Sequence, residues 1–280
     1  MSEKEIAHDR WGWELTSVRY VAFLDIMGFK DFIYRHSHAV VEKRMRVLSE
    51  IVSHHTQEQT IHLTIDVDNE TTSPASVEVT IRSVMFSDSI LVVAKDDSED
   101  SLVNLMRACA DIVHKCLTND IGIKGAISCG KFTADFDKSL YFGKPLIDAF
   151  YLQEELMFYG CIIDNTCEKR ISKFKELNKG HDNYKGLFKQ LKAPLKSGKV
   201  THFVIDIFSR YTDTSEKIIK SLYNTVSGKP RIYVDNTETV FATLARLEEA
   251  NKMLESEIIT NSARLLASAL VNSKKDKRIK

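Results

Sequence analysis

Two aspartates follow or interrupt short apolar runs that have the composition of strands. Asp25 ends the run 21–24, which is too short for a buried helix, and Gly28 then permits a turn before a helical apolar stripe that begins at Phe29. A carboxylate at such a strand end can take a hard cation, and the N–H groups of the turn can face phosphate oxygens. The alternative is that Asp25 serves only as a turn residue.

The second aspartate lies at the tip of an expected hairpin. Two β-rich runs, 81–86 and 90–93, flank the polar trio Ser87-Asp88-Ser89. An Asp at such a tip is ordinarily a turn former. If both acidic turns end strands of one sheet, however, their carboxylates lie side by side, within reach of a pair of divalent ions.

Composition excludes several classes of protein. The 280 residues carry 39 acidic and 39 basic side chains, so no strong net field recruits nucleic acid or an anionic membrane. No apolar stretch approaches the roughly 20 residues of a membrane span, and residues 1–13 lack the apolar core of a secretory signal. We therefore expect a cytoplasmic protein with no nucleic-acid partner and no membrane span. The five cysteines are an odd, scattered set, which predicts reduced and mostly buried thiols.

The order of the expected elements predicts an α+β fold. Between residues 21 and 164 the apolar pattern alternates as β-α-β-β-α-β, the split βαβ order of ferredoxin-like palms. The expected strands cover 21–24, 61–67, 77–86, 89–94, 121–132, 140–143 and 160–164. The expected helices cover 29–57 with a break near 36–38, 102–117 and 146–158.

Beyond residue 166 the pattern continues with helix, strand and a long terminal helix. The expected segments are a helix at 167–177, a basic connector at 189–199, a strand at 200–207, a helix at 218–226 and a helix from 237 to about 273. We divide the chain into a lead-in at 1–16, a main domain at 17–210 and a C-terminal helical extension at 211–280. Trp11 and Trp13 of the lead-in are expected to dock onto the main domain.

Four motifs, taken in order, resemble those of class III nucleotidyl cyclases. Asp25-Ile26-Met27-Gly28-Phe29 matches the first motif fully, and Ser87-Asp88 matches a Gly-Asp pair with Ser in place of Gly. Lys124-Gly125-Ala126-Ile127-Ser128-Cys129-Gly130 resembles the third, and Tyr141-Phe142-Gly143-Lys144-Pro145-Leu146-Ile147-Asp148-Ala149 loosely resembles the fourth. Each motif alone is unspecific, but four in the right order are hard to obtain by chance. The resemblance covers roughly residues 17 to 165.

The resemblance implies a fold, a chemistry and an assembly. It implies the ferredoxin-like palm of these cyclases and a reaction that turns a nucleoside triphosphate into a 3′,5′-cyclic nucleotide and pyrophosphate. Two divalent cations, Mn²⁺ or Mg²⁺, would be held by Asp25, Asp88 and the carbonyl of Ile26. Backbone N–H groups around Gly28, Phe29 and Lys30 would take the terminal phosphates. The family pattern also implies a homodimer with active sites at its interface.

Departures from the family pattern indicate the base. Val84 stands where adenylate cyclases carry a purine-reading Lys, and Tyr141 stands where they carry a purine-reading Asp. Without purine readers, the chain looks like the pyrimidine cyclases of bacterial Pycsar anti-phage defence, whose cyclic UMP or cyclic CMP acts on a separate effector protein. The Tyr141 hydroxyl can serve uracil or cytosine, and nearby Arg82, a pure donor, favours UTP.

Two further departures concern the transition state. Asp148 replaces the motif Asn, and Leu152 replaces an Arg that neutralises transition-state charge in the family. Either Lys144, Lys131 or Arg82 supplies the missing cation, or the activity is weak.

Two alternatives remain besides a cytidylate cyclase. The loss at Leu152 also fits a degenerate cyclase that binds a nucleotide and senses it without catalysis. A polymerase-like palm or a diguanylate cyclase would share the fold, but no Gly-Gly-Asp/Glu-Glu-Phe hairpin occurs around Ser87-Asp88. Fold alone does not decide among these classes.

Overall fold

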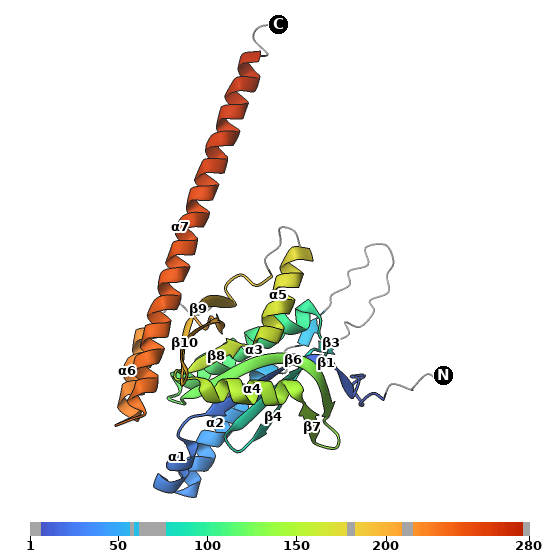
Figure 1. Ribbon diagram of the computed structural model, residues 1–280, viewed down its shortest axis with the longest axis vertical. Coiled ribbons are helices and arrows are strands. Elements are labelled where there is room, and N and C mark those ends of the chain that lie inside the picture. Colours follow the sequence, from blue (N-terminus) through green and yellow to red (C-terminus); the bar gives the residue numbers. More distant parts are fainter. Residues whose placement is uncertain (1–6, 57–58, 62–76, 178–182, 209–214, 277–280) are drawn as a thin grey trace. The chain divides into compact units, whose positions relative to one another are not determined.

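The computed structural model describes residues 7–56, 59–61, 77–177, 183–208 and 215–276 (Figure 1). They divide into two compact units, with the boundary between Val240 and Phe241. The first unit holds the sheet and its helices, and the second is the distal part of the last helix. The predicted division at residue 210 stays a prediction. None of the helices described is long and apolar enough to cross a bilayer.

A mixed sheet forms the centre of the first unit. Its strands follow the order β4-β5-β1-β6-β8-β10-β9, and β7 pairs with β6. The central strand β1 is antiparallel to β5 and β6, whereas β6 and β8 are parallel and joined through a helix. The strands are β1 (Thr16–Ile26), β4 (Ile81–Phe86), β5 (Ser89–Ala94), β6 (Ile123–Asp135), β7 (Leu140–Gly143), β8 (Gly160–Ile163), β9 (Phe188–Leu195) and β10 (Gly198–Ile205). A separate pair is formed by β2 (Gln59–Ile61) and β3 (Val77–Val79).

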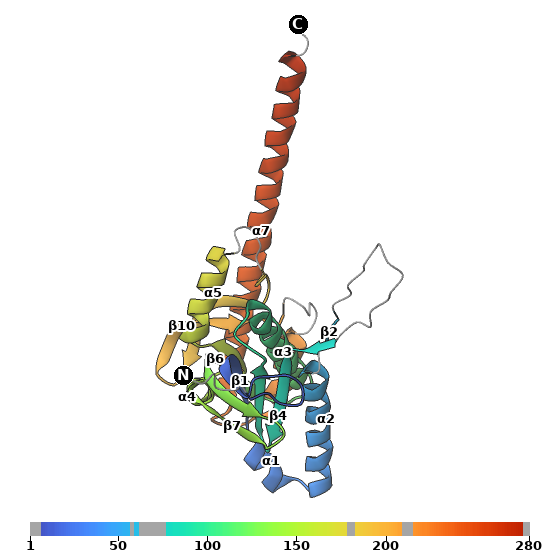
Figure 2. The same cartoon turned by 90° about the vertical axis from the view of Figure 1, so that its right-hand side faces the viewer.

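Helices cover both faces of the sheet. Figure 2 shows α2 and α3 on one side of the strands and α4 on the other. On the α4 side, Phe23 of β1 packs edge-on against Phe150 of α4, with ring centroids 5.4 Å apart. The helices are α1 (Phe29–Arg35), α2 (His38–Thr56), α3 (Glu99–Thr118), α4 (Lys144–Glu155), α5 (Asn165–Leu177), α6 (Ser215–Thr225) and α7 (Arg231–Asp276). The predicted α+β palm with its split βαβ order is confirmed.

One expected element was wrong. The basic connector predicted at 189–199 is mostly strand β9, which forms a hairpin with β10. Lys192 and Pro194 are poor strand formers, which hid the alternation in which Leu191 is buried and Lys192 exposed. Since β9 ends the strand order, it is an edge strand, where Pro and Lys are tolerated.

Other boundaries moved by a few residues. Helix α4 begins at Lys144 because Pro145 suits the first turn of a helix. Helix α7 begins six residues before the predicted start at 237. The strand predicted at 61–67 lies almost wholly outside the described residues, of which Ile61 belongs to β2. All five cysteines are free and buried, as predicted.

The lead-in docks mainly through one of its two tryptophans. Trp13 is 1% exposed and belongs to a core cluster with Val21 and Phe132. Trp11 is 55% exposed, and its ring faces the Arg82 guanidinium at 4.8 Å. The prediction that the lead-in packs onto the domain is therefore confirmed for Trp13, while Trp11 stays largely at the surface.

Candidate active site

The two acidic turns meet at one end of the sheet. Asp25 is paired with Ser89, the first residue of β5, and the backbone N–H of Ile26 donates to the Asp88 carbonyl at 2.9 Å. Ser87 adopts φ 55°, a value that favours Gly in a two-residue hairpin turn. The hairpin tolerates Ser here, so the one mismatch in the second motif leaves Asp88 next to the Asp25 turn.

The half-buried Asp25 carboxyl has an unusual proton affinity. Burial, and then the negative charge of Asp88, raise the pKa of Asp25 to about 6, against the opposing influence of Lys124. Two neighbouring carboxylates that repel each other in this way are suitable oxygen ligands for a hard divalent cation. The described residues hold no cluster of three or more His, Cys, Asp or Glu side chains arranged as a metal site.

A buried lysine, which the sequence analysis did not assign a role, completes this group. Lys124 of β6 is directly opposite Asp25, so both side chains project from the same face of the sheet. Its side chain is 3% exposed, and its Nζ lies 3.8 Å from Oε1 of Glu154 on α4. Burial lowers the pKa of Lys124, while Glu154 and Asp25 oppose that change. The signal in the sequence was a lysine at the start of an otherwise apolar strand.

The turn after Asp25 is held in place by backbone bonds. Gly28 has φ 73°, the left-handed conformation for which Gly is suited, and its carbonyl accepts the N–H of Phe32 at 2.9 Å. Met27 N–H donates to the Gly122 carbonyl at 2.8 Å, which ties the turn to the segment before β6. The amides of Phe29 and Lys30 belong to the first turn of α1, where N–H groups have no partner within the helix.

The three residues expected near the base also lie together. Arg82 and Val84 are on β4, on the same sheet face as Asp25, because the register links Val84 to Leu91 and Leu91 to Phe23. Val84 and Tyr141 both pack at the border of the Trp13 core cluster.

Arg82 has a partner that the sequence analysis did not foresee. Its Nη1 lies 2.7 Å from Oδ2 of Asp9, and the two side chains are 12% and 1% exposed. Arg82 was expected to read the base, but its guanidinium is already paired with Asp9.

The remaining expected residues gather at the start of α4. Lys144 forms an ion pair with Asp148 one turn later, which raises the pKa of Lys144. Both line an open groove of about 420 Å³, together with Leu152 and the turn that starts α5. Lys131, the other candidate cation, is exposed on β6. The structure thus forms three groups: the acidic turns with Lys124, the Arg82 group, and the groove beside α4.

Large apolar side chains are exposed around these groups. Phe86 of the acidic hairpin is 81% exposed and Tyr151 of α4 is 66% exposed. Phe142 and Ile147 are each 55% exposed.

Comparisons with known proteins found distant structural similarity. No family model matches the chain, and no curated protein matches it. The catalytic core of a rhodopsin-guanylyl cyclase with converted specificity, in complex with ATPalphaS, is 16% identical, with a TM-score of 0.44 over 68% of this chain and 94% of that chain. A class III adenylyl cyclase-like ATP-binding protein from Pseudomonas aeruginosa is 14% identical, with a TM-score of 0.38 over 74% of this chain and 40% of that chain. An EAL/GGDEF domain protein from M. capsulatus is 15% identical, with a TM-score of 0.27 over 44% and 68%. These matches are too distant to assign a function.

Proposed function

We propose that the protein is a nucleotidyl cyclase that converts a pyrimidine nucleoside triphosphate, UTP before CTP, into the 3′,5′-cyclic nucleotide and pyrophosphate. One observation carries the proposal: Asp25 and Asp88 meet at the end of the sheet, and burial, followed by the negative charge of Asp88, raises the pKa of Asp25 to about 6. Strained carboxylate pairs of this kind are typical of functional sites. The four ordered sequence motifs support the same reaction.

The reaction requires one bond to form and one to break. The ribose O3′ attacks the α-phosphorus, the bond from that phosphorus to the bridging oxygen breaks, and pyrophosphate leaves with that oxygen while the hydroxyl proton passes to water. Divalent ions bound at Asp25, Asp88 and the Ile26 carbonyl would supply Lewis acidity for the nucleophile and the leaving group.

The other residues of the site hold the triphosphate. The amides of Phe29 and Lys30, presented by the Gly28 turn, would donate to the terminal phosphates. Lys124 is buried opposite Asp25 and adds a fixed positive charge close to the reacting phosphate. This ammonium is the cation that would replace the one lost at Leu152, although it lies with the acidic turns and Leu152 lines the groove beside α4.

The base is proposed from Val84 and Tyr141. Burial raises the pKa of Tyr141, and a hydrogen bond with Ser139 opposes this change. A serine hydroxyl can donate that bond, which leaves the phenolic O–H to donate to a carbonyl such as O4 of uracil. UTP is placed before CTP because of this free phenolic O–H. Arg82, which favoured UTP in the sequence analysis, is paired with Asp9 and no longer carries that argument.

A homodimer fits the exposed apolar surface. Phe86, Phe142, Ile147 and Tyr151 are all large and exposed, and a second copy of the chain would cover them. In this assembly Asp25 and Asp88 of one protomer would face the Tyr141–Asp148 region of its partner. The cyclic product would act in the cytoplasm as a second messenger in anti-phage defence, read by a separate effector protein.

A second candidate function is a nucleotide sensor without catalysis. It is favoured by Leu152, which lines the groove beside α4 where the resembling cyclases have an Arg. Both aspartates are nevertheless present, and a sensor would not need a raised pKa at Asp25.

Competition among substrates tests the proposal. Purified protein is incubated with Mn²⁺ and equal concentrations of ATP, GTP, CTP and UTP, and the cyclic products are identified by mass spectrometry. We expect cyclic UMP to dominate. Mainly cyclic AMP or cyclic GMP would refute the pyrimidine assignment, and mainly cyclic CMP would refute the choice of uracil. Binding without any product would leave the sensor function.

A further inference from the structure

We propose that the N-terminal segment 9–13 is a specificity element, which holds Arg82 through Asp9 and thereby fixes the wall on which Val84 and Tyr141 meet the base. The proposal rests on the proposed function, because that function gives Val84 and Tyr141 their role. The N-terminal segment itself belongs to none of the motifs that support the cyclase assignment.

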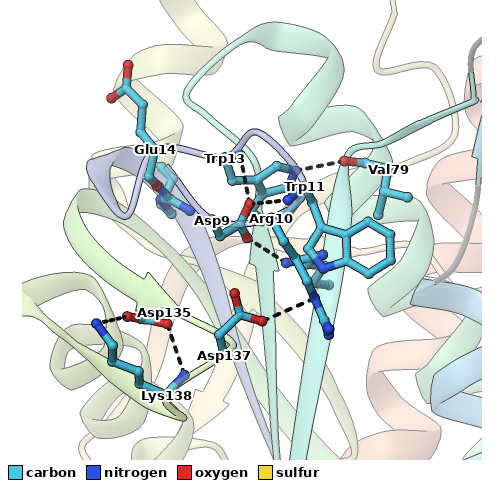
Figure 3. A network of polar contacts seen from close by, with 11 residues as sticks. Asp9, Arg10, Trp11, Trp13, Glu14, Val79, Asp135, Asp137 and Lys138 are labelled. Carbon is cyan, nitrogen blue, oxygen red and sulfur yellow. Dashed lines mark hydrogen bonds and ion pairs between the residues drawn. The ribbon is translucent and has the colours of Figure 1, made fainter. Parts of the chain in front are cut away.

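The segment 9–13 is a closed loop that its own hydrogen bonds hold together. One oxygen of Asp9, Oδ1, accepts the backbone N–H groups of Trp11 and Trp13, each at 2.9 Å. The Asp9 N–H donates to the Trp13 carbonyl at 2.9 Å, and Gly12 turns the chain with φ 77°. Figure 3 shows Asp9 inside this loop. With Oδ1 committed to the loop, Oδ2 is the oxygen that receives Arg82.

The loop is anchored to the sheet by Trp13. The indole N–H donates to the Val79 carbonyl at 3.1 Å (Figure 3). The ring is buried in the core cluster with Val21 and Phe132. An indole buries a large apolar area and needs one partner for its N–H, and both conditions are met here. The Asp9 carboxylate is therefore presented to Arg82 by a rigid support.

Arg82 is enclosed by aromatic rings as well as paired. Its guanidinium carbon lies 4.8 Å from the centroid of Trp11, 5.1 Å from Trp13 and 4.7 Å from Phe136. Phe136 in turn packs edge-on against Tyr141, with centroids 5.3 Å apart. A continuous set of contacts thus runs from Asp9 through Arg82 and Phe136 to the phenol that faces the base.

Removing Asp9 would release this set of contacts. A guanidinium that loses a buried carboxylate must find water or another acceptor, so Arg82 would leave its place among the rings. Phe136 and Tyr141 would then lose the support behind them, and the pocket would widen enough for a purine. We expect the ratio of kcat/KM for UTP to that for ATP to fall by about tenfold, the lower end of what a change in pocket shape achieves.

The ratio separates this role from a structural one. A variant that is merely less stable has less active protein for every substrate, so all four rates fall together and the ratio stays constant. The test variants are Asp9→Asn and Arg82→Lys. Arg82→Lys keeps the positive charge but loses the planar guanidinium that stacks on the rings. The matched control is Arg10→Ala, which breaks the exposed ion pair between this segment and Asp137 and leaves the ion pair between Arg82 and Asp9 in place.

The experiment measures kcat/KM for the four triphosphates with Mn²⁺, and their dissociation constants by calorimetry, in wild type and each variant. We expect a lower UTP-to-ATP ratio in Asp9→Asn and Arg82→Lys, and an unchanged ratio in Arg10→Ala. An unchanged ratio in both test variants overturns the proposal, as does a wild type that shows no base preference. If the wild type binds nucleotides and cyclises none, the proposed function fails, while the ratio of dissociation constants still decides this proposal.

Discussion

Replacing Asp25 by Asn is expected to stabilise the metal-free protein at neutral pH while it abolishes cyclisation. In the folded chain the pKa of Asp25 is raised to about 6 by burial and by Asp88. The folded state therefore binds this proton more tightly than the unfolded state does, and stability falls as the pH rises from about 4 through 6. Above pH 6 the full cost is present, and Asn removes it because it carries no charge.

The size of the effect follows from the pKa difference. One pKa unit corresponds to about 1.4 kcal/mol, so the change from the ordinary value gives an upper bound of roughly 3 kcal/mol. Asp25 is only half-buried, and solvent screening reduces this bound to about 1 kcal/mol. For a folded domain of the size of the first compact unit, the midpoint of thermal unfolding of Asp25→Asn should exceed that of the wild type by about 2–4 °C.

Thermal unfolding in EDTA at pH 7.5 and pH 4 is the assay. We expect Asp25→Asn to be more stable than wild type at pH 7.5, with the gap closing toward pH 4. Added Mn²⁺ should stabilise the wild type and not Asp25→Asn, since ligands raise the stability of the state that binds them. The control is Asp31→Asn, an exposed aspartate in an ion pair with Arg35, which should change stability by less than about 0.5 kcal/mol. A variant that is no more stable than wild type at pH 7.5 would refute the electrostatic reasoning.

Three further outcomes are expected. Lys124→Met removes a charge that lowers the pKa of Asp25, so the acid limb of the pH–rate profile should move to higher pH. The value of kcat/KM should also fall at least about tenfold. An acid limb that does not move would exclude this role of Lys124. Mixing an Asp25→Ala chain with a Tyr141→Ala chain should restore activity in heterodimers, and heterodimers that stay inactive would refute shared sites. Gly125→Ala should destabilise the protein by about 1–3 kcal/mol in chemical denaturation, because the new Cβ would lie 2.1 Å from Leu24 Cδ2; an unchanged midpoint would contradict the close packing of β1 on β6.

Local chemistry made the acidic turns predictable from the sequence. Asp25 and Asp88 each follow or interrupt an apolar strand, and turn residues mark where those strands end. The order of the elements then predicted the palm, because alternating and helical periods are visible in a short window. The juxtaposition of the two turns was a consequence of that order.

Contacts over long sequence separations were not predictable in the same way. Arg82 and Asp9 are 73 residues apart, and the residues next to each of them give no indication of the other as a partner. Lys124 faces Asp25 only because of the β1–β6 register, and a shift of one residue would place it on the other face. The edge strand β9 was missed because lysine has a low intrinsic preference for strands. At the edge of a sheet, however, lysine is common.

Product formation in Asp25→Ala and Asp88→Ala tests the central claim most directly. Each variant, the wild type and Asp31→Ala are incubated with UTP and Mn²⁺, and cyclic UMP and pyrophosphate are quantified at equal concentrations of folded protein. The carboxylate pair predicts that both products disappear in Asp25→Ala and Asp88→Ala while Asp31→Ala stays close to wild type. Near-wild-type cyclisation by either variant would contradict a two-metal site built on these aspartates.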